Sequence, residues 1–154
     1  KNIWGVEGEV PDEDVLLPFG KARIEQEGAD ISIVSWSAQL HVASEAAENL
    51  QKKGISAEVI DLRTLWPWDK EAVFSSVEKT GRLLITHESV AVGGFGAEIA
   101  ATVSEHMFKA LKHPVRRCAA LRVPISYAPP LEDMIRVTAN NIVDVATTMM
   151  DNGN

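Results

Sequence analysis

The sequence predicts an α/β fold, a three-layer α/β/α sandwich around a mostly parallel, five-stranded sheet. From Lys21 onward, short runs rich in β-branched residues alternate with longer amphipathic runs, and this pattern is typical of a sheet covered by crossover helices. The chain has 154 residues, of which 45% are hydrophobic. This length and composition favour one domain with a single core.

Strands and helices alternate along the predicted domain. The sequence predicts strands near residues 22–26, 31–36, 56–60, 83–86 and 115–119. It predicts helices near residues 38–53, 69–79, 95–111 and 140–150. Residues 28–30 form the expected turn between the first two strands, and Gly54 and Gly81 stand where glycine commonly ends a helix.

Capping residues and apolar stripes support the predicted helices. Ser37 and Asp69 stand directly before the first two helices, where a side-chain oxygen commonly accepts a hydrogen bond from the helix backbone. Apolar faces with helical spacing are formed by Leu40, Ala43, Ala47 and Leu50 in the first helix and by Ile99, Val103, Met107 and Leu111 in the third. Such faces predict helices that pack against a sheet.

The two ends of the chain differ in composition from the predicted domain. Residues 1–19 carry five carboxylates, Pro11 and Pro18 and no steady periodicity, and these features predict an extended linker arm. Residues 20–150 form the predicted domain. The polar residues 151–154 are expected to be a disordered tail.

Charge, cysteine content and hydropathy exclude several classes of protein. The formal net charge of -7 disfavours a nucleic-acid or anionic membrane surface and suits basic protein partners. The single cysteine, Cys118, excludes a disulfide framework and favours a reducing compartment. Its apolar surroundings predict a buried side chain. No apolar run approaches the ~20 residues of a membrane helix, so we expect a soluble, intracellular protein.

The strand and turn before the third predicted helix are the first candidate for a functional site. The predicted strand ends at His87 and Glu88, and Gly93, Gly94 and Gly96 follow at the start of the helix. Open α/β sheets bind ligands beside strand ends and helix amino-termini. His87 and Glu88 are predicted either to face an active-site entrance or to hydrogen-bond locally. The glycines either cradle an anion or permit a tight turn and close helix–strand packing.

Residues after the third predicted strand are candidates for a subunit interface. Arg63 is expected to pair with a carboxylate across that interface, or internally with Asp61 or Glu88. Trp66 and Trp68 flank a proline and are predicted either to anchor a partner or to close the core. No spacing of His, Cys or carboxylate residues predicts a metal site.

Several short motifs run in order along most of the chain. They are Gly20-Lys21-Ala22, Glu27-Gly28-Ala29-Asp30, Glu58 to Thr64, Pro67-Trp68-Asp69, Thr80 to Leu84, His87-Glu88, Gly93 to Ile99 and Tyr127 to Glu132. Together they resemble the transketolase carboxy-terminal domain, and more narrowly that domain in the beta subunit of thiamine-dependent 2-oxo acid dehydrogenases. The His-Glu pair followed by Gly-Gly-Phe-Gly resembles the branched-chain enzymes, and also some pyruvate enzymes.

The resemblance implies a component of a multienzyme complex. In this family two alpha and two beta chains assemble, and thiamine diphosphate and magnesium lie between the alpha chain and the other domain of the beta chain. The acyl unit then passes to a lipoyl group of an acyltransferase. The resemblance therefore implies that this domain holds neither a catalytic residue nor the cofactor, and that it is inactive alone.

The resemblance also implies partners and a compartment. The implied partners are the alpha subunit, a second beta subunit and the peripheral binding domain of the acyltransferase, with no nucleic acid and no membrane. The implied compartment is the mitochondrial matrix if the source is eukaryotic and the cytoplasm if it is bacterial. The implied local role is assembly and docking, in which complementary charge steers the encounter.

One short run departs from the family pattern. Family members often carry an acidic residue between a leucine and the Ala-Pro before the last strand, where it contacts the basic acyltransferase. Here the run is Leu111-Lys112-His113-Pro114, so Lys112 and His113 are candidates for an interface of altered charge. The alternatives that stay open are a pyruvate-type enzyme, a purely structural module and an anion-binding regulatory module.

Overall fold

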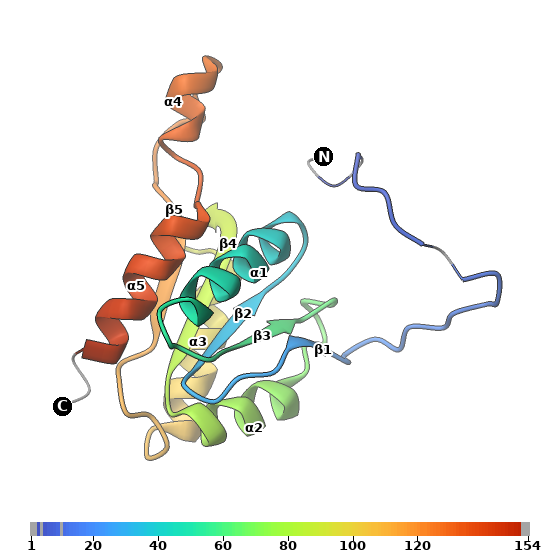
Figure 1. The fold of residues 1–154 in the computed structure, drawn as a ribbon, viewed down its shortest axis with the longest axis vertical. Coiled ribbons are helices and arrows are strands. Elements are labelled where there is room, and N and C mark those ends of the chain that lie inside the picture. The colour runs from blue at the N-terminus through green and yellow to red at the C-terminus, as the bar shows by residue number, and fades with distance from the viewer. Residues whose placement is uncertain (1–2, 4, 10, 152–154) are drawn as a thin grey trace.

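The structure is a computed structural model that describes residues 3, 5–9 and 11–151 (Figure 1). Its strands are β1 (Arg23–Gln26), β2 (Ile31–Ser35), β3 (Ala57–Asp61), β4 (Leu83–Val90) and β5 (Arg116–Ala120). Its helices are α1 (Ala38–Gln51), α2 (Lys70–Thr80), α3 (Phe95–Met107), α4 (Pro129–Asp133) and α5 (Ala139–Asp151). These bounds confirm every predicted strand and the four predicted helices. The short helix α4 was not predicted.

The strands form one sheet in the order β1-β3-β2-β4-β5. β3, β2, β4 and β5 run parallel, and β1 pairs with β3 in the antiparallel direction. The chain crosses the sheet in one direction from β2 to β3 and in the other from β3 to β4, so its direction reverses between β2 and β4. In sheets of this kind, the carboxyl ends of the strands beside the reversal are the usual ligand-binding edge.

Helices cover both faces of the sheet and bury two apolar clusters. α1 and α5 pack on one face, with Leu50 among the buried side chains, and α2 and α3 pack on the other, with Val77 among them. The neighbouring β2 residues Ile33 and Val34 belong to opposite clusters, because successive strand side chains alternate across a sheet. The predicted three-layer sandwich is therefore confirmed.

The structure confirms two of the predicted helix-end residues and contradicts part of the prediction for a third. Asp69 caps α2 as predicted, because its carboxylate accepts the Ala72 N–H at 3.1 Å; it also accepts the Ala22 N–H at 3.0 Å. Gly81 ends α2 in the left-handed conformation, with a φ of 73°. Ser37 stands at the predicted cap of α1, but its φ is 56° and its side chain makes no cap hydrogen bond, so that part of the prediction was wrong. Capping residues normally have extended backbone.

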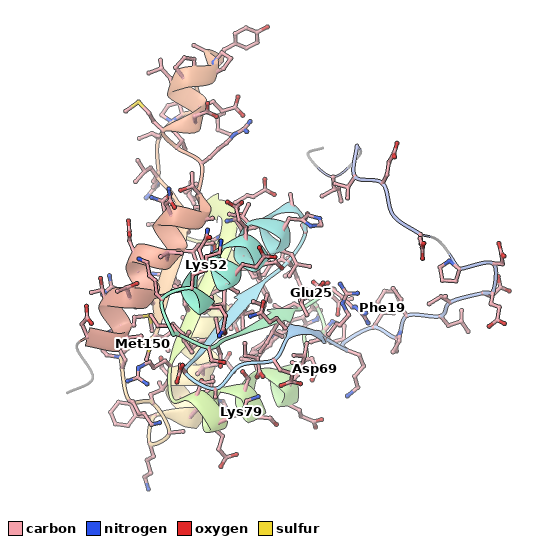
Figure 2. All side chains as sticks on the ribbon, viewed as in Figure 1. Phe19, Glu25, Lys52, Asp69, Lys79 and Met150 are labelled. Carbon is pink, nitrogen blue, oxygen red and sulfur yellow. The ribbon has the colours of Figure 1, made fainter. Side chains whose placement is uncertain are left out.

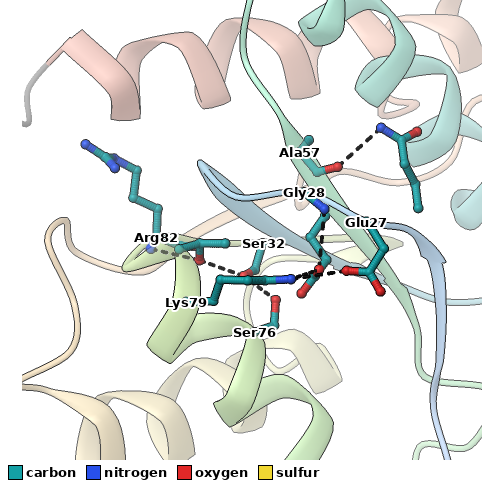
Figure 3. Close-up of polar contacts among 10 residues, drawn as sticks. Glu27, Gly28, Ser32, Ala57, Ser76, Lys79 and Arg82 are labelled. Carbon is teal, nitrogen blue, oxygen red and sulfur yellow. Dashed lines mark hydrogen bonds and ion pairs between the residues drawn. The ribbon is translucent and has the colours of Figure 1, made fainter.

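A buried polar network lies near the amino-terminal ends of β2 and β3 (Figure 3). The hydroxyl of Ser32 on β2 is hydrogen-bonded to the hydroxyls of Ser76 and Thr80 on α2, at 2.6 and 2.8 Å. Glu58 on β3 is 2% exposed and forms an ion pair with Lys79 on α2. The hydrogen bonds and the ion pair offset part of the cost of burying these polar groups between α2 and the sheet.

Two segments project from the body of the domain. Residues 121–136, which include α4, extend beyond the end of α5 (Figure 1). The described part of the arm 1–19 leaves the domain beside β1, and its ribbon runs away from the body beyond Phe19 (Figure 2). Of the predicted disordered tail, only Asp151 is described, and it ends α5. Residues 152–154 lie outside the described residues, so the predicted domain bounds stay predictions.

Candidate functional site

His87 and Glu88 lie within β4, which continues to Val90 instead of ending before them. Their side chains point to opposite sides of the strand, so His87 is fully buried and Glu88 is exposed. The His87 ring stacks on Trp36 at the end of β2, with ring centroids 5.2 Å apart and an interplanar angle of 20°. Phe95 meets Trp36 edge-on at 6.2 Å. The predicted pair is therefore divided between the core and the surface.

The glycine turn after β4 packs directly on His87. A Cβ atom at Gly96 would lie 2.5 Å from the His87 Nε2 atom, and a Cβ atom at Gly94 would lie 2.4 Å from the Val90 carbonyl oxygen. Gly93 has a φ of 76°, and nothing lies within 4 Å of a Cβ placed there. Glycine adopts this backbone conformation without strain. These contacts favour the turn and close-packing interpretation, and an anion cradle stays a prediction.

Burial sets the charge of His87. Loss of water on burial lowers the pKa of the imidazole; the nearby backbone of Ser89 opposes this shift, and the Arg117 guanidinium adds to it. Among the described residues, no group is placed well enough to form a hydrogen bond with either ring nitrogen. The ring is therefore neutral at pH 7. A role for His87 and Glu88 at an active-site entrance stays a prediction. Of the two residues, Glu88 is the one that faces the surface.

The candidate residues after β3 take different positions. Arg63 is exposed with a φ of 56°, and its backbone N–H contacts Asp61, 3.0 Å from Oδ1. Trp66 is 76% exposed, whereas Trp68 is 5% exposed and packs edge-on against Phe74. Trp68 thus closes the core, and Trp66 is available to a partner. Because β2 lies between β3 and β4 in the sheet, this loop is set apart from the glycine turn.

Lys112 and His113 lie beside a groove between α3 and β5. His113 is buried, and its Nδ1 atom lies 2.7 Å from the Pro114 carbonyl oxygen. The groove has a volume of about 820 Å³, and no carboxylate is among the described residues that line it. We call it the basic groove and define it by Ala97, Ala100, Phe108, Lys109, Lys112 and Arg117.

Residues 121–136 form an apolar outcrop that was not predicted from the sequence as a surface. Its large exposed side chains are Leu121, Val123, Ile125, Tyr127, Leu131 and Met134. Arg136 pairs with Glu132 one turn earlier, at 2.7 Å. The sequence feature that could have indicated this surface is the apolar composition of these residues, which show neither helical nor strand periodicity. Exposed apolar surface of this kind commonly marks an interface.

Cys118 is buried on β5, as predicted. Burial raises the pKa of its thiol to about 11. Because the thiolate is the reacting form, we expect the folded chain to react with iodoacetamide at pH 8 at least about tenfold more slowly than the urea-unfolded chain. Timed alkylation followed by mass spectrometry measures both rates. Equal rates in the two states would contradict this prediction.

The described residues do not fit a magnesium–diphosphate group. They contain no cluster of three or more His, Cys, Asp or Glu side chains placed to hold a metal ion, whereas magnesium is held through carboxylate and phosphate oxygens. No helix of the described part is long and apolar enough to cross a membrane. The arrangement offers surfaces for other chains: the outcrop, Trp66 and the basic groove.

Comparison with known proteins identifies relatives of the chain. The family model described as "Transketolase, C-terminal domain" matches residues 20–142. The chain is 47% identical over 136 residues to 2-oxoisovalerate dehydrogenase subunit beta 2, mitochondrial, of Arabidopsis thaliana, covering 88% of this chain and 37% of that protein. It is 45% identical over 135 residues to pyruvate dehydrogenase E1 component subunit beta, mitochondrial, of Dictyostelium discoideum, covering 88% and 38%. It is 40% identical over 153 residues to acetoin:2,6-dichlorophenolindophenol oxidoreductase subunit beta of Cupriavidus necator, covering 99% and 45%.

A solved structure has the same fold. Split gene transketolase, described as an inactive beta4 tetramer, matches with a TM-score of 0.79 and 27% identity, covering 96% of this chain and 47% of that chain. The chain spans less than half the length of each of these relatives. Because the family model covers most of the predicted domain and the fold agrees, the chain belongs to the transketolase C-terminal domain family.

Proposed function

We propose that this chain is the carboxy-terminal domain of the beta subunit of a thiamine diphosphate-dependent 2-oxo acid dehydrogenase. The whole enzyme decarboxylates a 2-oxo acid oxidatively and passes the acyl unit to a lipoyl group. This domain contributes subunit contacts and a docking surface for the acyltransferase. The observation that carries the proposal is the family match over residues 20–142, together with relatives named as dehydrogenase beta subunits.

The proposed substrates are branched-chain 2-oxo acids. The 47% identity to a 2-oxoisovalerate dehydrogenase subunit supports this choice, and the Gly-Gly-Phe-Gly turn after His87 and Glu88 agrees with it. A pyruvate-type enzyme is the alternative, because the identity to a pyruvate dehydrogenase subunit is 45%. An acetoin-type subunit at 40% identity belongs to the same group of relatives.

In the proposed enzyme, decarboxylation takes place in parts of the protein other than this domain. Thiamine diphosphate and magnesium are proposed to be bound outside this domain, as the family resemblance implies. The proposed partners are the alpha subunit, a second beta subunit and the acyltransferase. The compartment is the mitochondrial matrix in a eukaryote, in line with the relatives named as mitochondrial, and the cytoplasm in a bacterium.

A purely structural module is the second candidate function. The exposed apolar outcrop of residues 121–136 favours it, because such a surface suits permanent contacts between chains. A regulatory anion site has less support. Gly94 and Gly96 pack against His87 at distances that leave no room for a Cβ atom.

Calorimetric titration with the peripheral binding domain of a 2-oxo acid dehydrogenase acyltransferase tests the proposed function. We expect salt-sensitive binding that is at least about tenfold tighter for the branched-chain version than for the pyruvate version. The variant Lys112→Glu introduces an acidic side chain and should tighten binding to this basic domain, whereas Lys52→Glu, directly after α1, should not. Tighter binding of the pyruvate version would change the substrate class, and binding to neither would overturn the docking role.

A further inference from the structure

We propose that His87 is a pH-sensitive contact that holds the glycine turn in place while its ring is neutral and releases the turn when the ring gains a proton. The glycine turn denotes residues 91–94, which join β4 to α3. The proposal concerns packing inside the domain. It therefore goes beyond the proposed dehydrogenase function and does not depend on it.

The His87 ring fills the space beneath the turn. The side chain is 0% exposed, and its face stacks on Trp36 with ring centroids 5.2 Å apart. The edge of the ring lies against the backbone at the start of α3. A Cβ atom at Gly94 would lie 2.8 Å from the ring Cε1 atom, and one at Gly96 would lie 2.5 Å from Nε2. The two glycines thus allow the backbone of the turn to pack directly on the ring.

The surroundings of the ring suit a neutral imidazole better than an imidazolium. Both ring nitrogens of His87 are buried without a hydrogen-bond partner among the described residues. An imidazolium carries two N–H donors and a positive charge, and a buried charge without a partner is costly. A proton on the ring therefore favours a state in which water reaches the nitrogens.

A neighbouring cation adds to the cost of a proton on His87. Arg117 on β5 pairs in register with Ile85 on β4, and both lie on the same face of the sheet as His87 because side chains alternate along a strand. Burial and the Arg117 charge together lower the pKa of the His87 ring, and they outweigh the opposing effect of the Ser89 backbone.

The other elements packed around the ring contribute two carboxylates that are placed on the surface. Glu88 follows His87 on β4, so its side chain points to the other side of the strand. Glu98 lies in the first turn of α3 and is exposed. β2, with Trp36 after it, and the glycine turn consist of uncharged residues. These positions leave the buried edge of the ring without a neutralising carboxylate among the described residues.

The connection between the turn and the sheet allows the turn to move by itself. His87 pairs with Ala119 of β5, but Val90 pairs with the next residue, Ala120, so β4 bulges between them and its regular pairing is interrupted. Beyond the bulge, the Ala91 N–H lies 3.4 Å from the Ala120 carbonyl oxygen, which is long for a hydrogen bond. Interrupted pairing of this kind favours local opening of the turn over unfolding of the sheet.

Opening of the turn would also change the basic groove. The Arg117 guanidinium donates to the Ala91 carbonyl oxygen at 2.6 Å, and the same side chain lines the groove. When Ala91 moves with the turn, Arg117 loses the contact that fixes its position. Acid would thereby alter a surface that is available to partners.

The direction of the pH effect follows from the two states of the ring. In the open turn the His87 ring is in water and has its ordinary pKa of 6.5, whereas burial and Arg117 hold its pKa below that value in the closed turn. The closed turn therefore binds fewer protons than the open turn. Opening becomes more favourable as pH falls below about 6.5, and well above that value the ring is neutral in both states.

Amide hydrogen exchange of the chain, measured by NMR and corrected for the intrinsic exchange rate at each pH, tests this contact. The Ala97 N–H donates to the Gly94 carbonyl oxygen at 2.9 Å and reports on the turn. The Ile55 N–H donates to the Leu50 carbonyl oxygen at 3.0 Å, beside the opposite face of the sheet, and is the reference. From about pH 7.5 to about pH 5.5, corrected exchange at Ala97 should become several-fold faster, at most about tenfold, and exchange at Ile55 should stay constant.

Two variants remove the titrating group. His87→Gln keeps a polar side chain, and His87→Phe keeps an aromatic ring against Trp36. Exchange at Ala97 should lose its pH dependence in each variant that thermal unfolding shows to be folded. The matched control is His41→Gln, which replaces an exposed histidine on α1 and should keep the pH dependence of the unchanged chain.

The unchanged chain provides a check that needs no variant. The NMR signals of the His87 ring should titrate at a lower pH in the folded chain than in the urea-unfolded chain, and equal midpoints would overturn the proposal. So would exchange at Ala97 that does not respond to pH, or a response that persists in the His87 variants. A parallel rise at Ile55 would also overturn it, because the whole domain would then be loosening.

Discussion

Replacing Gly28 by alanine should destabilise the domain far more than the same change at Gly8 or Gly54. A Cβ atom at this position would lie 2.2 Å from the Ala57 carbonyl carbon and 2.2 Å from the Glu58 backbone nitrogen. Both atoms are backbone at the start of β3, so no side-chain rotation relieves the overlap. We expect a loss of about 3 kcal/mol or more in the free energy of unfolding.

Urea denaturation of the Gly28→Ala chain measures this loss, and the two other glycines serve as controls. Gly8 has nothing within 4 Å of an added Cβ atom, so Gly8→Ala should leave stability unchanged. Gly54 also has open space but a φ of 79°, so Gly54→Ala should cost about 1 kcal/mol through backbone strain alone. If Gly28→Ala cost no more than Gly54→Ala, the close approach to β3 would be wrong.

Replacing Lys79 by methionine should have the second large effect. Methionine keeps an apolar stem but leaves the carboxylate of Glu58 without its cation. The Glu58 side chain is 3% exposed, whereas that of Lys79 is 43% exposed. An uncompensated buried charge is costly, and the partial exposure of Lys79 reduces the loss. We expect about 2–4 kcal/mol less stability at pH 7.

Two further variants distinguish the effect of the unpaired Glu58 charge on stability from the effect of losing any lysine ion pair. Glu58→Gln in the Lys79→Met background removes the unpaired charge and should recover part of the lost stability at pH 7. Lys21→Met breaks an exposed ion pair with Glu71, at 4.0 Å, and should cost less than about 0.5 kcal/mol. A loss in Lys79→Met no larger than that in Lys21→Met would contradict the proposed importance of the pair.

The pH dependence of the Lys79→Met loss follows from Glu58. Burial raises the pKa of Glu58, but hydrogen bonds from Lys79, Ser76 and the Gly28 backbone outweigh it and hold the pKa below its ordinary value of 4.5. A lowered pKa in the folded state stabilises the native chain above about pH 4.5, and this contribution disappears as pH falls through the folded value. Without Lys79 the burial effect dominates and raises the pKa of Glu58. Protonation of Glu58 at low pH then removes the unpaired buried charge from the variant. The stability difference between the two chains should therefore shrink from pH 7 to pH 4.

Local patterns in the sequence were sufficient to predict the order and type of the main elements. Apolar spacing along a helix or strand is a local property, so the four long helices and all five strands were predicted near their observed bounds. Cap chemistry is local too, which is why Asp69 and Gly81 were identified correctly as ends of α2. The motif order was sufficient to identify the family that the comparisons confirm.

Packing between distant segments sets which of two neighbouring residues is buried and which surfaces form. His87 is buried because Trp36, the residue directly after β2, stacks on it. Trp66 and Trp68 differ because only Trp68 meets α2 through Phe74. These outcomes depend on contacts between segments distant in the sequence, which no local pattern encodes. The basic groove has the same origin. Its cations come from the segment after α3 and from β5, and they gather on one surface only because α3 packs back on the sheet beside β5.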